Sequence, residues 1–119
     1  MIPISERSRP TGLLHVFDLD EQATIEHMVS IPKGMCPKSG NPVEGVISLA
    51  YTASVAVEVV SLHELISKAQ RHSPKTFEGW CLYIGRAVAE AVGQPVKYTA
   101  EATVNPGPQT LKVSSCVST

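Results

Sequence analysis

Apolar and polar residues alternate along several stretches of the chain, which is the pattern of strands with one buried face. Residues 24–31 and 96–104 alternate cleanly until proline and glycine or asparagine residues interrupt them. Residues 44–60 form a longer extended region, rich in β-branched residues, with a bulge or break expected at Ser54. A last alternating stretch covers residues 111–117. The pattern therefore predicts two strands in each half of the chain.

Helical spacing replaces this alternation between the two pairs of strands. Ser61 and Glu64 have the spacing of a capping box, so a first helix is expected to begin at Ser61. Ser73 and Pro74 offer the N-cap and first-turn proline of a second helix, which Gly93 ends. The apolar positions with helical spacing are Leu62, Leu65, Ile66 and Ala69 in the first helix, and Phe77, Trp80, Cys81, Ile84, Val88, Ala91 and Val92 in the second.

The order strand, strand, helix, helix, strand, strand predicts an α+β domain, an antiparallel sheet with two helices on one face. Residues 1–22 show no clear period and are expected to be an N-terminal arm, loose or docked onto a partner, before a single domain at 23–119. The other face and the edges of such a sheet need covering, and copies arranged as a barrel would cover both. We therefore expect a homo-oligomer.

Composition excludes several classes of function. The net charge is −1 and like charges do not cluster, so direct binding of nucleic acid is not expected. The longest apolar stretch, residues 43–62, is interrupted by six polar residues, which rules it out as a membrane span. The N-terminus lacks a signal-peptide core, so we expect a cytoplasmic protein. Three widely spaced cysteines indicate neither a disulfide scaffold nor a zinc ribbon.

Residues 35–42, between the first two predicted strands, read Met-Cys-Pro-Lys-Ser-Gly-Asn-Pro. This loop resembles that of the 7-cyano-7-deazaguanine reductases, a family of nitrile reductases in the tunnelling-fold superfamily. In that family, the cysteine of the loop adds to the nitrile of the substrate. The resemblance implies that Cys36 is a catalytic nucleophile.

Two weaker similarities accompany the loop. Residues 57–62 resemble the family's segment at the junction of strand and helix, and Phe77-Glu78 resembles its substrate-binding Phe-His-Glu. The order of strands and helices is also that of the family, so the resemblance covers roughly residues 25–117. It implies a tunnelling fold (ββααββ), an oligomeric barrel with sites at subunit interfaces, and a small-molecule substrate of queuosine-type 7-deazaguanine biosynthesis.

The cysteines differ in their expected roles. A nucleophilic Cys36 must react as thiolate, and Lys33 and Lys38 are candidates to lower its pKa; the alternative is a small structural cysteine in a turn. Cys81 lies among the apolar positions of the second helix and is expected in the core. Cys116, near the end of the last strand, is expected to be inert packing.

A carboxylate could hold the base that the resemblance implies, because a deazaguanine presents two adjacent donors that one carboxylate can accept together. Glu58 and Glu78 both qualify, and Ser61 and Phe77 lie in the matched substrate-binding segments. For each glutamate the alternative is a residue on an exposed face, which for Glu78 is the first turn of a helix.

The chain departs from the family in two places. Val43 stands where the family has a catalytic Asp, and Glu44 follows one residue later, which would point its carboxylate to the opposite face of a strand. Val60 and His63 stand where the family has two lysines that bind the cofactor, so we expect no NADPH. His63 could instead act as an acid or base. No spacing supports zinc bound by Cys36 and histidines, and no metal is expected.

Four functional hypotheses follow. The first is an enzyme that adds Cys36 to the substituent of a 7-substituted 7-deazaguanine without NADPH, forming an amidine with ammonia or hydrolysing the adduct. The second is a decarboxylase of 7-carboxy-7-deazaguanine. The third is an NADPH-dependent nitrile reductase in which Glu44 replaces the Asp and His63 or Lys68 replaces a lysine. The fourth is a non-catalytic purine-binding subunit.

Overall fold

The structure, a computed structural model, describes residues 9–30, 34–35, 42–69, 77–104 and 109–118. Its elements follow in the order β1 (Arg9–Thr11), β2 (Leu14–Ser30), β3 (Gly34–Met35), β4 (Pro42–Val57), α1 (Val59–Ala69), α2 (Phe77–Val92), β5 (Val96–Val104) and β6 (Gln109–Val117). The strands form one antiparallel sheet in the order β1-β2-β4-β5-β6, with β3 paired to the start of β4. The predicted α+β class and the order of the long elements are confirmed.

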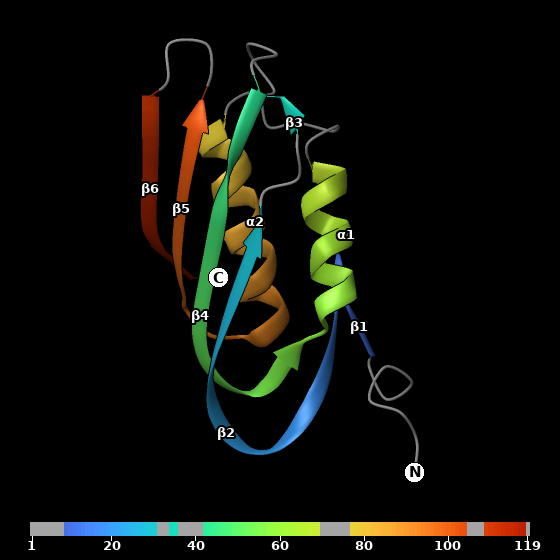
Figure 1. The fold of residues 1–119 in the computed structure, drawn as a ribbon. Helices are drawn as coiled ribbons and strands as arrows, with labels where there is room; N and C mark the ends of the chain where they lie inside the picture. Colours follow the sequence, from blue (N-terminus) through green and yellow to red (C-terminus); the bar gives the residue numbers. More distant parts are fainter. Residues whose placement is uncertain (1–8, 31–33, 36–41, 70–76, 105–108, 119) are drawn as a thin grey trace.

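Both helices pack on the same face of the sheet (Figure 1). Alternate residues of the two central strands are buried beneath them, as the period of two requires. These residues are Ile47, Leu49, Tyr51 and Ala53 on β4 and Val96, Tyr98, Ala100 and Ala102 on β5. No described element covers the opposite face, which is called the outer face below. The core is therefore a single layer between the sheet and the helix pair.

β2 and β4 both curve strongly where β4 approaches α1 (Figure 1). Asp18 pairs with Val55 and Ala23 pairs with Ala53, so four residues of β2 lie opposite Ser54 alone. Extra residues in one strand of a pair bend and twist it. The irregularity predicted at Ser54 is confirmed in its position, but the extra residues belong to β2 and not to the strand that carries Ser54.

The bend also changes the beginning of the first strand. Residues 14–22, which the pattern assigned to an arm, are the first part of β2, and Leu14 and Val16 are fully buried. The three extra residues of β2 at the bend break the alternation, so a strand that continues through them has no continuous sequence pattern. This is why the pattern places the start of the strand at residue 24.

The start of α1 differs from the expected capping box. The helix begins at Val59, and the residue before it, Glu58, accepts hydrogen bonds from the backbone N–H groups of Val60 (3.0 Å) and Ser61 (2.7 Å). A side chain that accepts from the second and third helical amides is an N-cap, so Glu58 takes this role and Ser61 lies inside the first turn. The prediction that the helix begins at Ser61 was wrong.

The second helix agrees with its predicted face and end. Its buried side chains are Trp80, Cys81, Ile84, Val88, Ala89, Ala91 and Val92. Gly93 has a φ of 67° and its N–H donates to the carbonyl of Ala89 at 2.8 Å, which ends the helix. The expected N-cap at Ser73 and Pro74 lies outside the described residues. Neither helix in the described part of the chain is long and apolar enough to cross a membrane.

Candidate functional site

The residues proposed for function lie at two opposite ends of the sheet. β4 begins beside β3, at the end of the sheet where β5 finishes and α2 starts, and it finishes at the other end, where α1 starts (Figure 1). The 16 residues of α2 alone span roughly 24 Å. The two groups of residues are therefore too far apart to contact one small ligand within a single chain.

The first end carries the residues that flank the cysteine loop. Met35 and Pro42 are paired, so both flanks of the segment 36–41 lie at this end of the sheet. Cys36 itself, with Lys38, lies outside the described residues, and so does Lys33. Glu44 pairs with Thr103 of β5 two residues after Pro42, and the structure does not describe its side chain.

The first turn of α2 belongs to the same end. Phe77 is its first residue, and the structure does not describe its side chain; Glu78 follows and is exposed. An acidic side chain in a first turn is stabilised by the partial positive charge of the helix N-terminus. Glu78 is thus an available carboxylate at the end of the sheet that also carries the flanks of Cys36.

The second end holds Glu58 and Ser61 in a backbone network. The Ser61 hydroxyl donates to the carbonyl of Glu58 (2.8 Å) and accepts from the N–H of His15 on β2 (3.1 Å). The N–H of Glu58 in turn donates to the carbonyl of His15 (2.8 Å). These bonds join β2, the end of β4 and the start of α1. Both carboxylate oxygens of Glu58 and the hydroxyl of Ser61 are thus hydrogen-bonded to the backbone, where they stabilise the fold.

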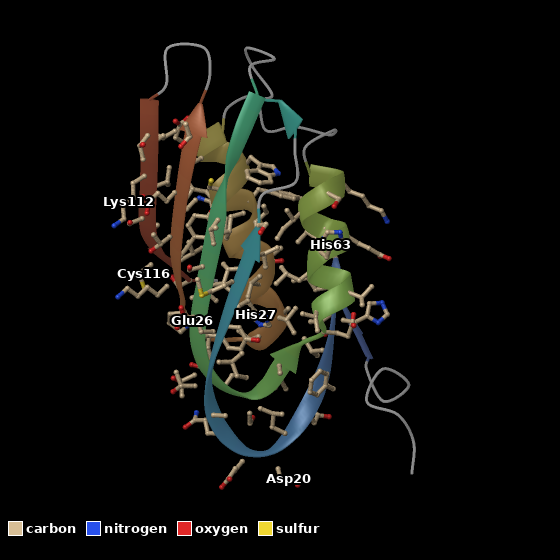
Figure 2. All side chains as sticks on the ribbon, in the orientation of Figure 1. Asp20, Glu26, His27, His63, Lys112 and Cys116 are labelled. Carbon is tan, nitrogen blue, oxygen red and sulfur yellow. The ribbon has the colours of Figure 1, made fainter. Side chains whose placement is uncertain are left out.

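The exposed surface of α1 near this end is apolar. Val59 and Val60 are 66% and 61% exposed, and His63 is exposed one turn further along the helix (Figure 2). The one basic residue in the last turn of this helix is Lys68. The first turn of α1 therefore presents no side chain that could pair with a phosphate.

A second polar contact braces the bend of β4. The hydroxyl of Tyr51 accepts from the buried N–H of Val57, six residues later on the same strand, at 2.9 Å. The same hydroxyl lies 2.8 Å from Nε2 of His27 on β2, and its proton can be donated to the neutral imidazole. Burial lowers the pKa of His27 and raises that of Tyr51. Sequence reasoning missed Tyr51, because only the bend brings its ring next to Val57.

The two described cysteines differ in exposure. Cys81 is fully buried on α2 beside Tyr98, and burial raises the pKa of its thiol to about 11, as expected for a core cysteine. Cys116 is exposed on the outer face of β6 (Figure 2). The prediction that Cys116 is inert packing was wrong, because residues 110, 112, 114 and 116 point away from the helices.

Two shallow hollows lie on the outer face among the residues that the structure describes. One, of about 270 Å³, lies at the end that flanks Cys36 and is lined by Gly45, Val46, Glu101, Ala102, Thr103 and Thr110. The other, of about 560 Å³, lies over β5 and β6 and is lined by Lys97, Tyr98, Thr99, Lys112, Ser114, Ser115 and Cys116. Ligand pockets usually measure roughly 300–1,000 Å³ and enclose most of the ligand. The larger hollow has a sufficient volume, but both hollows are open to solvent, so neither would enclose a purine within one chain.

No three His, Cys, Asp or Glu side chains gather closely enough to hold a metal ion among the residues that the structure describes. Comparison with known proteins found no match to any family model and no match to any curated protein.

Proposed function

We propose that this protein is an enzyme that acts on a 7-substituted 7-deazaguanine, with Cys36 as the nucleophile that attacks the substituent. The observation that carries the proposal is the sequence of residues 35–42, which resembles the nitrile-attacking loop of the 7-cyano-7-deazaguanine reductases. Supporting it, the flanks of this loop are paired, between two strands of an antiparallel sheet with a helix pair after the second of them.

The chemistry needs no cofactor. The Cys36 thiolate adds to the nitrile carbon, the nitrile nitrogen takes up a proton, and a thioimidate results. Ammonia then attacks the same carbon, the carbon–sulfur bond breaks, and the products are an amidine and the free thiol. Water in place of ammonia gives the amide. No electrons are transferred in either sequence.

Glu78 is the better candidate to hold the base. Each oxygen of Glu58 already accepts a backbone N–H at the start of α1, whereas Glu78 is exposed at the end of the sheet that flanks Cys36. A carboxylate that accepts both donors of a pyrimidine edge needs both of its oxygens free. This difference favours Glu78, with Glu58 as a structural cap.

The surface of α1 supports a reaction without NADPH. Cofactor phosphates need fixed positive charge, and the exposed side chains in the first turn of this helix are Val59 and Val60. Beyond that turn, the side chains on α1 that could carry a positive charge are His63 and, in the last turn, Lys68.

The separation of the candidate residues supports a tunnelling-fold oligomer. Exposed His63 lies in the first half of α1, away from the end that carries Glu44 and Glu78. A site that used both groups would take them from different copies of the chain, which is the arrangement expected for a barrel with sites at subunit interfaces.

The direct test is intact-protein mass spectrometry after mixing the protein with 7-cyano-7-deazaguanine. We expect a covalent adduct of the mass of the nitrile in the wild type and in Cys116→Ser, and none in Cys36→Ala. Cys116→Ser is the matched control, because it removes an exposed cysteine that could react non-specifically. Cys81 is buried and present in every variant, so it is not expected to contribute an adduct.

An adduct that persists in Cys36→Ala would refute the assignment of the nucleophile. Binding without an adduct would indicate another reaction, and release of carbon dioxide from 7-carboxy-7-deazaguanine would then identify the decarboxylase. Oxidation of NADPH in the presence of the nitrile would identify the reductase, and binding without any turnover would identify a purine-binding subunit.

A further inference from the structure

The larger hollow of the outer face carries positive charge. It lies over β5 and β6, has a volume of about 560 Å³, and none of the described residues that line it is acidic. Its two lysines, Lys97 on β5 and Lys112 on β6, are both exposed. The smaller hollow, further along the same strands, is lined by Glu101 and by no basic residue that the structure describes. The two hollows therefore favour ligands of opposite charge.

The register of the strands places two hydroxyl groups between these lysines. Thr99 lies directly opposite Ser114, and both side chains are on the outer face. Lys97 is two residues before Thr99 and Lys112 is two residues before Ser114, so in antiparallel strands the lysines lie on opposite sides of the hydroxyl pair. Two residues of a strand span about 7 Å, and a lysine carries its ammonium group on a flexible four-carbon stem. Both ammonium groups can therefore reach the space above the hydroxyl pair.

The two hydroxyl groups are available to a ligand. Thr24 and Thr52, which also face each other across two strands, are hydrogen-bonded to each other, with their oxygens 3.0 Å apart. The structure describes Thr99 and Ser114 and shows no such bond between them. A hydroxyl that is not engaged in this way can donate its proton to an oxygen of a ligand. Two positive charges and two hydroxyl donors thus surround one point of the outer face.

We propose that this hollow binds a phosphate group, held by the ammonium groups of Lys97 and Lys112 and by the hydroxyl groups of Thr99 and Ser114. We call it the phosphate hollow. A phosphate group carries up to two negative charges and at least three strong acceptor oxygens, so it can contact all four groups at once. A carboxylate has one charge and two oxygens and would leave part of this arrangement unused. The proposal does not depend on the reaction at Cys36.

The phosphate hollow is separate from the end of the sheet that carries the flanks of the cysteine loop. Those flanks lie where β5 finishes, since Val43 pairs with Val104. Thr99 is five residues before Val104, or about 17 Å along the strand. The volume of the hollow is in the usual range for small organic ligands. The bound group can therefore be free phosphate or the phosphate of a monoester such as a nucleotide.

Glu101 limits the affinity of the phosphate hollow. It is exposed on the outer face, directly opposite Lys112 and two residues after Thr99. Opposite charges across an antiparallel pair attract, so Glu101 competes with a phosphate for Lys112 and also repels the phosphate. Lys97 has no such neighbour, because the residues opposite it are Ala50 and Cys116. Loss of the Glu101 charge should therefore strengthen phosphate binding, whereas loss of a lysine should weaken it.

Cys116 supplies a reporter of occupancy. It is exposed in the phosphate hollow, opposite Lys97 and on the same strand as Lys112 (Figure 2). Its alkylation by iodoacetamide, a neutral reagent, is followed by mass spectrometry of the peptide that contains it, at fixed pH and ionic strength. The phosphate concentration that gives half-maximal protection measures the affinity. Each variant is compared with itself in the absence of phosphate, so differences in the reactivity of the thiol cancel.

We expect inorganic phosphate to slow the alkylation of Cys116 in the wild type until the effect saturates. Lys97→Gln and Lys112→Gln should each raise the half-maximal concentration about two- to fivefold, the range for an exposed ion pair, and the double variant should lose the protection. Glu101→Gln should lower the half-maximal concentration by a similar factor. Lys68→Gln is the matched control, because Lys68 is an exposed lysine on α1, outside the hollow, and this variant should behave as the wild type.

Protection that is absent from the wild type, or unchanged in the double variant, would refute the phosphate hollow. An equal loss in Lys68→Gln would also refute it, since it would show attraction by net charge alone. Guanosine monophosphate and guanosine distinguish the sources of the phosphate. A lower half-maximal concentration for the monophosphate than for inorganic phosphate would identify a phosphate ester as the ligand, and an equal one would identify phosphate itself. Equal protection by guanosine would show that the base is recognised and would overturn the proposal. None of these measurements uses Cys36, so a failure here is distinguishable from a failure of the proposed reaction.

Discussion

Tyr51→Phe removes one hydroxyl and tests how the bend of β4 is stabilised. In the wild type this hydroxyl accepts from the N–H of Val57 (2.9 Å) and contacts Nε2 of His27 (2.8 Å). The ring remains in the variant, so no large cavity forms, but the buried N–H of Val57 loses its acceptor. An unsatisfied buried donor costs about 1–3 kcal/mol, while half-buried His27 can turn to water at little cost. We expect the free energy of unfolding to fall by about 1–3 kcal/mol.

Urea unfolding monitored by circular dichroism measures this change, at one fixed protein concentration because association also affects stability. Tyr83→Phe is the matched control: Tyr83 is 39% exposed on α2, and its substitution should change stability by less than about 0.5 kcal/mol. If Tyr51→Phe is as stable as Tyr83→Phe, the hydroxyl does not hold the bend and the reasoning fails. A loss of helical circular-dichroism signal in Tyr51→Phe before the main transition would support the reasoning, because α1 follows the bend directly.

Three further predictions concern stability. Glu58→Ala should lower the free energy of unfolding by about 0.5–2 kcal/mol, because it removes the N-cap of α1. Glu64→Ala should change it by less than about 0.5 kcal/mol. A larger effect of Glu64→Ala would indicate that Ser61 and Glu64 cap the helix instead. Gly45→Ala should destabilise by about 1–3 kcal/mol or more, because its Cβ would overlap the Glu101 carbonyl oxygen and lie 2.7 Å from a backbone Cα of β5, and a neutral result would show that the strands can separate there. Burial lowers the pKa of His27 in the folded state, so the unfolded chain binds more protons and stability should fall as the pH drops below about 6.5, levelling off below the folded pKa. Urea titrations at several pH values should show this slope in the wild type and a smaller one in His27→Gln; equal slopes would contradict it.

The parts of the fold that sequence predicted well have an uninterrupted local pattern. β5 alternates over its whole length, and the apolar face of α2 repeats with helical spacing until Gly93. In both cases each residue's environment depends on its immediate neighbours in the chain, which is why a period can be recognised. β2 was predicted only from Thr24 onward, since the bulge before Ala23 interrupts the period.

The candidate site was harder to predict because its members depend on contacts far apart in the chain. The motif around Cys36 and the carboxylates Glu58 and Glu78 can be read from the sequence, but the two glutamates look equivalent there. The structure separates them, with one as the cap of α1 and the other exposed at the start of α2. The same applies to cysteines, since alternation marks Cys116 as part of a strand without showing which face a helix covers.

Periodicity and residue type are local properties, so the types of the long elements, their order and the residues that could carry chemistry can all be predicted from the chain alone. The end of the sheet that each candidate occupies, the face that is left open and the edges that are free follow only from how the elements pack. Those properties follow from a bend set by unequal numbers of residues in β2 and β4, and from helices that cover one face only. A bulge needs a partner strand and a buried face needs a covering helix, so neither is specified by any single segment of the chain.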